Sequence, residues 1–201
     1  MGEAIRFDVY FDYLCPYSYE AAALLRRVAT AGLEFGVHWR YFSLTQVNNV
    51  EPGWTIWDAP LDSPARGRLA FQAAESARRQ GRFDDFHWRL LAARHEDGES
   101  LEDERTIQAV GAAAGLDLEQ LKRDVEDRDV LAALKRDHLD AVERHHVFGT
   151  PTFVFDDAGA AYVRLRPAPD GEEATRVFRQ LCEIIPGQGY LRELKRPSAA
   201  R

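Results

Sequence analysis

The stretch that most constrains the fold of this chain covers residues 5–31, where a strand pattern gives way to a Cys-Pro pair and then to a helix pattern. Alternating apolar and polar residues over 5–11 predict a β-strand. Residues 21–31 are rich in Ala, Leu and Arg, with an apolar stripe typical of an amphipathic helix. Pro16 suits the first helical position, because the helix could not bond that N–H in any case. The pattern therefore predicts Cys15 at or next to the N-cap.

A thiol at a helix N-terminus differs chemically from an ordinary buried cysteine. The unpaired backbone N–H groups and the positive end of the helix dipole both favour the ionised thiolate, which is the nucleophilic form. The second cysteine, Cys182, lacks this context. It lies among apolar residues at helical spacing, so we interpret it as a core residue and not as a redox partner of Cys15.

The rest of the chain gives a clear order of elements. In chain order it predicts a strand at 35–42, a long loop at 43–64, a helical region at 65–146, two strands at 149–155 and 161–165, and a final helix at 170–185. The loop carries Trp54 and Trp57, which either bind a ligand or pack on the core. Asp170, with Glu173 three residues later, predicts a capping box for the last helix.

This order is that of an α/β protein with a thioredoxin-like fold and a large all-helical insertion between its βαβ and ββα halves. We predict a thioredoxin-like domain formed by residues 1–64 and 147–190. The inserted helical domain covers 65–146, and a C-terminal tail covers 191–201.

Charge and hydropathy limit the classes of function. The net charge of -7 argues against a nucleic-acid-binding protein, which normally has a basic face. No apolar run approaches the roughly 20 residues of a membrane span, and residues 1–6 lack the pattern of a signal peptide. Two cysteines offer no disulfide framework, which fits a reducing compartment. We therefore expect a cytoplasmic protein that binds neither nucleic acid nor a membrane.

Four stretches, in the expected order, resemble the DsbA-like thioredoxin-fold superfamily. They are Phe11-Asp12-Tyr13 followed by Cys15-Pro16-Tyr17-Ser18, then Gln80–His87, Ala114–Asp117 and Phe148–Val154. The chain is most similar to the FrnE-type proteins, with the 2-hydroxychromene-2-carboxylate isomerases and the kappa-class glutathione transferases as relatives. Redox-active members of the superfamily carry a second cysteine three residues after the first, where this chain has Ser18.

The resemblance implies a thiol-disulfide oxidoreductase with a single active cysteine. Cys15 would attack a disulfide, and an external thiol would resolve the mixed disulfide. Ser18 would donate a hydrogen bond to the thiolate as the second catalytic residue. The residues expected to bind substrate are Pro16, Tyr17, Thr150 and Pro151, the last of which resembles the cis-proline of the family.

We expect no metal site and no tightly bound cofactor, with a low-molecular-weight thiol such as glutathione or mycothiol as the resolving group. The substrate would be a disulfide-containing protein or small molecule, and formation of a homodimer is left open. An alternative is a transferase or isomerase that binds glutathione without net redox change, with Asn48, Asn49 and Trp57 contacting the organic substrate. A third class is a binding module that has lost turnover, supported by Ser18 alone.

Overall fold

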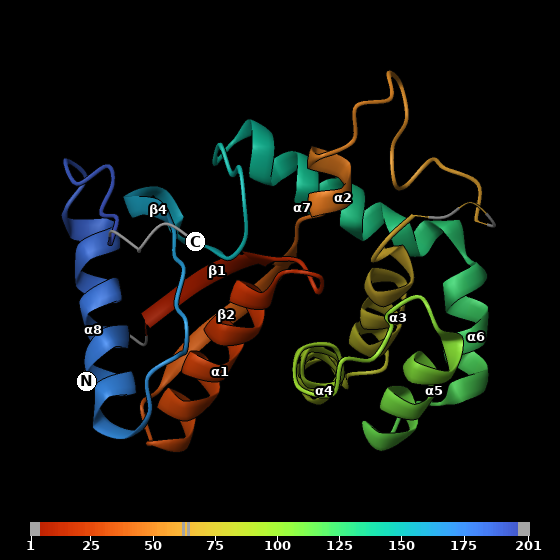
Figure 1. Ribbon diagram of the computed structural model, residues 1–201, viewed down its shortest axis with the longest axis horizontal. Coiled ribbons are helices and arrows are strands. Elements are labelled where there is room, and N and C mark those ends of the chain that lie inside the picture. Colours follow the sequence, from red (N-terminus) through yellow and green to blue (C-terminus); the bar gives the residue numbers. More distant parts are fainter. Residues whose placement is uncertain (1–4, 62, 64, 197–201) are drawn as a thin grey trace.

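A sheet in the order β2-β1-β3-β4 organises the computed structural model, which describes residues 5–61, 63 and 65–196 (Figure 1). β1 (Ile5–Phe11) is parallel to β2 (Phe35–Tyr41) and antiparallel to β3 (Thr152–Phe155). β4 (Gly159–Tyr162) is antiparallel to β3. Because β3 runs against β1, the residues that follow β1 and those that precede β3 meet at the same end of the sheet.

Helices cover both faces of this sheet. α1 (Pro16–Thr30) connects β1 to β2 and packs against α8 (Gly171–Gly187), the last helix (Figure 1). The period-two alternation of β1 places Phe7 against Phe178 of α8. Tyr10 belongs to a smaller cluster with Ala141, which lies on α7 (Leu131–Glu143). The two clusters explain why nearly every residue of β1 after Arg6 is buried.

The helical insertion lies between β2 and β3, as predicted. It follows α2 (Leu44–Val47) and comprises α3 (Arg68–Arg79), α4 (Phe83–His95), α5 (Glu104–Ala113), α6 (Leu118–Glu126), a 3-10 turn (Arg128–Val130) and α7. Figure 1 shows α3 to α6 gathered beside the sheet domain, while α7 leads the chain back toward the sheet. This confirms the thioredoxin-like fold with a helical insertion. The domain boundaries at residues 65 and 146 stay a prediction.

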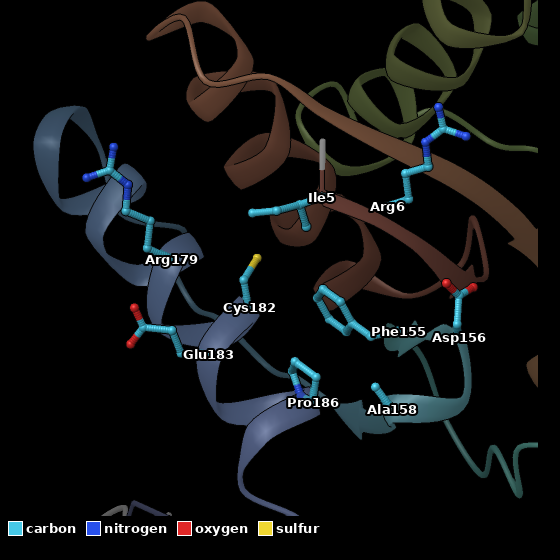
Figure 2. A pocket seen from close by; sticks show the side chains of 9 residues that line it. All are labelled: Ile5, Arg6, Phe155, Asp156, Ala158, Arg179, Cys182, Glu183 and Pro186. Atoms are coloured by element: carbon cyan, nitrogen blue, oxygen red, sulfur yellow. The ribbon is translucent and has the colours of Figure 1, made fainter. Parts of the chain in front are cut away.

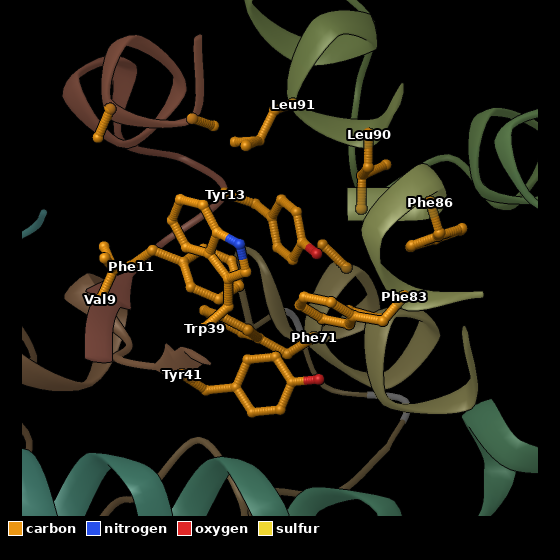
Figure 3. Close-up of a cluster of buried hydrophobic side chains, with 14 of the residues drawn as sticks. Val9, Phe11, Tyr13, Trp39, Tyr41, Phe71, Phe83, Phe86, Leu90 and Leu91 are labelled. Carbon is orange, nitrogen blue, oxygen red and sulfur yellow. The ribbon is translucent and has the colours of Figure 1, made fainter. Parts of the chain in front are cut away.

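One hydrophobic core joins the sheet to the insertion (Figure 3). Phe11 of β1 lies with its ring centroid 5.5 Å from that of Trp39 in β2. The same ring is 6.4 Å from Phe71 of α3 and 4.5 Å from His87 of α4. Since the aromatic contacts continue from the sheet into α3 and α4, the inserted helices share a core with the strands.

Three local predictions were wrong: the limits of one strand, the absence of a short helix and the cap of the last helix. β4 begins at Gly159 and ends at Tyr162, earlier than predicted, because β3 offers no pairing partner beyond Thr152. α2 was missed inside the predicted loop; the Ser43 hydroxyl starts it by accepting the Gln46 N–H at 3.1 Å. The Asp170 side chain makes no capping bond, since it instead forms an ion pair with Arg27 at 2.8 Å.

Other boundaries moved by a few residues. α7 ends at Glu143, before the predicted end of the helical region, and His146 has a φ of 53° in the left-handed region. α8 continues to Gly187, past the predicted end. Within the ranges that the structure describes, no helix is both long enough and apolar enough to cross a membrane.

Candidate active site

Cys15 is the N-cap residue of α1, as predicted. Its backbone is extended, with φ -86° and ψ 117°, and Pro16 opens the helix behind it. The Cys15 carbonyl accepts the Ser18 N–H at 3.1 Å, so the first turn closes directly on the cysteine. The residue keeps 5% of its surface exposed. The thiol therefore lies at the positive end of the helix, almost shielded from water.

The loop before β3 faces this thiol. The peptide bond between Thr150 and Pro151 is cis. The Cys15 thiol donates a hydrogen bond to the Thr150 carbonyl, with 3.2 Å between sulfur and oxygen. The Pro151 carbonyl in turn accepts the Val163 N–H at 3.1 Å. Cys15 and the Thr150-Pro151 pair, which lie more than a hundred residues apart in the sequence, thus come together at one end of the sheet.

Ser18 is fully buried beneath the cysteine turn. Its hydroxyl oxygen accepts the Asp12 N–H at 3.3 Å. Among the hydrogen bonds of the described residues, none joins this hydroxyl to the Cys15 sulfur, so its donation to a thiolate stays a prediction. Ser18 holds together the two ends of the turn that carries Cys15.

Asp12 is a site residue that the sequence reasoning missed. Its buried carboxylate accepts the N–H of Leu14 and the N–H of Leu44, each at 2.7 Å. These bonds tie the cysteine turn to the start of α2. Burial raises the pKa of Asp12 to about 6, although both N–H groups act in the opposite direction. The available signal was an acidic residue between apolar neighbours, two positions before the amide that it bonds.

The outer rim of the site contains aromatic rings and arginines. Tyr17 is partly exposed, and its hydroxyl accepts a hydrogen bond from the Arg164 guanidinium, which lies 4.1 Å above the Tyr17 ring. That bond lowers the pKa of Tyr17. Tyr162 of β4 meets Phe148 edge to face at 5.2 Å, and Phe148 is 71% exposed. Arg164 and Tyr162 were not predicted as site residues, because only the fold brings them to Cys15.

The remaining predicted substrate residue, Pro16, is exposed beside Cys15 at the first helical position. Trp57, which the alternative function placed at an organic substrate, is 8% exposed and packs 5.4 Å from the ring of His138. Trp57 is therefore part of the core.

Cys182 occupies a different place, and both cysteines are free. It is half-buried and packs against the hydrophobic core, on the wall of a hollow of about 460 Å³ that also involves Ile5, Phe155 and Pro186 (Figure 2). Burial, helped by the charge of Glu183, raises the pKa of Cys182 to about 11. None of the residues around this hollow belongs to the Cys15 site.

Comparison with curated sequences finds two longer proteins. The chain is 28% identical over 144 residues to Na⁺/H⁺ antiporter NhaA 3 of Salinispora tropica. It is 30% identical over 146 residues to Na⁺/H⁺ antiporter NhaA 1 of Salinispora arenicola. Each match covers 72% of this chain and 19% of the antiporter. The chain thus spans about a fifth of the length of the curated relatives that it matches.

Solved structures match over nearly the whole chain. A probable DsbA oxidoreductase from Streptomyces coelicolor has a TM-score of 0.63 and 19% identity, covering 96% of this chain and 94% of that one. A 2-hydroxychromene-2-carboxylate isomerase has a TM-score of 0.62 and 18% identity, covering 89% and 96%. The cytosolic disulfide reductase DsbM from Pseudomonas aeruginosa, solved with GSH, has a TM-score of 0.61 and 16% identity, covering 88% and 98%. At these identities the likeness concerns the fold.

The family assignment rests on a sequence model. The model of the DSBA-like thioredoxin domain matches residues 6–168, which include β1, the Cys15 turn, the helical insertion and the Thr150-Pro151 loop. This match extends from the first strand to beyond the last, so it covers every element that builds the site. The chain therefore belongs to the DSBA-like thioredoxin domain family.

Proposed function

We propose that this chain is a thiol-disulfide oxidoreductase that works through a single cysteine, Cys15. The observation that carries the proposal is the contact of 3.2 Å between the Cys15 sulfur and the Thr150 carbonyl, at the N-terminus of α1. A nucleophilic sulfur is thereby held against the backbone of the loop before β3, where a substrate can be aligned with it. Membership of the DSBA-like family supports the same class of reaction.

The reaction proceeds in two exchanges of sulfur. The Cys15 thiolate attacks one sulfur of a substrate disulfide, a Cys15–substrate S–S bond forms, and the other substrate sulfur leaves with the electron pair as a thiolate. An external thiolate then attacks the substrate sulfur of this mixed disulfide. Cys15 leaves as the thiolate, and the new disulfide joins the external thiol to the substrate fragment. Cys15 is thereby regenerated, and the external thiol has replaced one half of the substrate disulfide. A second external thiolate that attacks the new disulfide completes the two-electron reduction of the substrate.

Two features favour a mechanism with one cysteine. A hydroxyl stands at position 18, and a serine cannot form the internal disulfide that a second cysteine would form. Cys182 lies at a separate hollow on α8, so it is not in the Cys15 site. An external low-molecular-weight thiol is therefore the group that we propose for the second step.

The Thr150 carbonyl couples ionisation to substrate binding in this proposal. In the reduced, protonated state it accepts the thiol proton of Cys15. A thiolate has no proton to donate, so ionisation leaves this carbonyl free to accept an N–H from an extended substrate. Thr150 and Pro151 then act as substrate-binding residues, and Pro16 and Tyr17 border the same opening.

The alternative isomerase or transferase loses part of its support in this arrangement. It requires Trp57 at the organic substrate, and Trp57 is packed against His138 in the core. The fold likeness to a 2-hydroxychromene-2-carboxylate isomerase is equally compatible with either chemistry.

Mass spectrometry and a reductase assay test the proposal together. Treatment of the native protein with glutathione disulfide at pH 7 should add one glutathione to Cys15. The protein should also reduce a glutathionylated peptide when reduced glutathione is supplied. Cys15→Ser should lose both properties, whereas Cys182→Ser should keep both, since a thiol with a pKa of about 11 is almost entirely protonated at pH 7. Full reductase activity in Cys15→Ser would rule out the proposed mechanism.

A further inference from the structure

The segment after β4 is fixed against the active site at two points. Val163 N–H donates to the Pro151 carbonyl at 3.1 Å. Ala168 N–H donates to the Glu20 carboxylate of α1 at 2.7 Å. Two exposed arginines, Arg164 and Arg166, lie on the short stretch between these anchors. Their position beside the N-terminus of α1 is therefore set by backbone hydrogen bonds.

Both arginines act on the rim of the Cys15 site. Arg164 donates to the Tyr17 hydroxyl, and together with Arg166 it lowers the pKa of Tyr17. The pKa of Arg164 is raised, chiefly by that hydrogen bond. Tyr17 lies two residues after Cys15 in the first turn of α1, and Val163 is bonded to Pro151 in the loop that faces the Cys15 sulfur. Arg164 therefore lies on the rim of the Cys15 site.

Neither arginine has a carboxylate partner within ion-pair distance in the ranges 5–61, 63 and 65–196. This contrasts with other arginines of a chain whose net charge is -7, such as Arg27, Arg40 and Arg79. A guanidinium has five N–H donors, and the Tyr17 hydroxyl occupies one of them on Arg164. The free donors beside a reactive sulfur are suited to a carboxylate.

We propose that Arg164 and Arg166 bind the carboxylate of the small thiol or disulfide that reacts at Cys15, so that the site selects carboxylate-bearing thiols. This inference rests on the proposed oxidoreductase function and names its substrate class. The carboxylate accepts N–H donors from the two guanidinium groups while its sulfur exchanges at Cys15, with the same bonds forming and breaking as above. Glutathione, which has carboxylates, fits this site better than mycothiol, which has none.

Three small disulfides of similar length test the inference: dithiodipropionate is anionic, hydroxyethyl disulfide is neutral and cystamine is cationic. The rate of mixed-disulfide formation at Cys15 is measured for each at low ionic strength. The ratio of the anionic to the neutral rate should fall about two- to fivefold in Arg164→Gln and in Arg166→Gln, the range typical of one exposed ion pair. Added salt should shrink the same ratio in the native protein. Because a ratio cancels any change in the reactivity of the sulfur itself, it reports recognition.

Arg105→Gln is the matched control, because it removes an exposed positive charge from α5, away from the Cys15 site. Its ratio should equal that of the native protein. Equal ratios in the native protein and in both Arg164→Gln and Arg166→Gln would overturn the inference, and so would a fall of the same size in Arg105→Gln. If Cys15 forms no mixed disulfide with any of the three reagents, the proposed function itself fails. If Cys15 reacts with all three reagents but the ratio of the anionic to the neutral rate is the same in the native protein and both arginine variants, only the proposed carboxylate site is rejected.

Discussion

The turn from Asp12 to Cys15 sets how the thiol is presented. The Cys15 N–H donates to the Asp12 carbonyl at 3.1 Å, and the Asp12 N–H donates to the Ser18 hydroxyl at 3.3 Å. The Asp12 carboxylate adds the amides of Leu14 and Leu44. Since each of these bonds involves the backbone, the position of the sulfur is fixed by the main chain. Ser18 contributes to that turn through its hydroxyl, a role that is separate from the resolving role of a cysteine.

At this scale, Ser18→Cys should convert the site into a dithiol. Position 18 lies one turn into α1 and its N–H is bonded to the Cys15 carbonyl, so a sulfur there should reach Cys15. We expect the oxidised variant, made in a Cys182→Ser background, to lose two hydrogens and both free thiols. Intact-mass measurement after mild oxidation, with a thiol titration, checks this.

Ser18→Ala in the same background is the control and should keep one free thiol after oxidation. Two persistent thiols in the Ser18→Cys protein would mean that the two side chains do not meet. The arrangement of the first turn of α1 would then need revision.

Elements with a strong local pattern were the ones that the sequence predicted. The alternation in β1 and β2, and Pro16 at the start of α1, give those elements within a residue of their observed ends. The contact between Cys15 and Thr150 joins parts of the chain 135 residues apart, so it could be expected only from the family resemblance.

Elements set by tertiary contacts were missed or displaced. The limits of β4 depend on where β3 stops, and the placement of Arg164 depends on the bond from Val163 to Pro151. The hydrogen bond from the Leu44 N–H to the Asp12 carboxylate likewise forms only because the start of α2 lies against the cysteine turn. A sequence pattern carries no record of these partners, which explains why the rim of the site was predicted less completely than the cysteine.

The junction between β4 and α8 supplies a prediction at the scale of elements. Gly159 has a φ of 153°, and a Cβ built on it would lie 2.5 Å from the Ile185 carbonyl oxygen of α8. A backbone oxygen cannot move away cheaply, so Gly159→Ala should force α8 off the sheet. We expect the free energy of unfolding to fall by about 1–3 kcal/mol. Urea denaturation checks this value.

Gly187→Ala, two residues after Ile185 at the C-terminal end of α8, is the matched variant. A Cβ there meets nothing within 4 Å, so its stability should stay close to that of the native protein. Equal midpoints for the two alanine variants would contradict the close approach of β4 and α8.

At the scale of the whole molecule, a buried histidine connects the two halves of the fold. His87 of α4 lies 4.4 Å from Trp39 and 4.5 Å from Phe11, both in the sheet, and its Nδ1 lies 3.0 Å from the Tyr13 hydroxyl. Its Nε2 is buried with no hydrogen-bond partner among the described residues. The imidazole is therefore neutral in the folded protein, and burial lowers the pKa of His87 to about 3.

This histidine should make the fold sensitive to mild acid. Below about pH 6.5 the unfolded chain binds a proton at position 87, whereas the folded chain binds one only near pH 3. Stability is therefore lost as the pH falls through 6.5, by about 1.4 kcal/mol per pH unit for this one group. His138, whose pKa burial lowers to about 4, acts in the same direction. Asp12, with its pKa raised to about 6, acts in the opposite direction between pH 6 and 4.

His87→Phe isolates this effect, because it keeps an aromatic ring in the same contacts and removes the titrating group. The free energy of unfolding of His87→Phe minus that of the native protein should increase by about 1.4 kcal/mol as the pH falls from 6 to 5. The contributions of Asp12 and His138 are the same in both proteins and cancel in this difference. Urea unfolding at pH 8, 6 and 5 measures this, with exposed His146→Gln as the control. If the free energies of unfolding of His87→Phe and the native protein changed in parallel with pH, the His87 imidazole would bind a proton in the folded state. This part of the core, between the insertion and the sheet, would then accommodate a charged group.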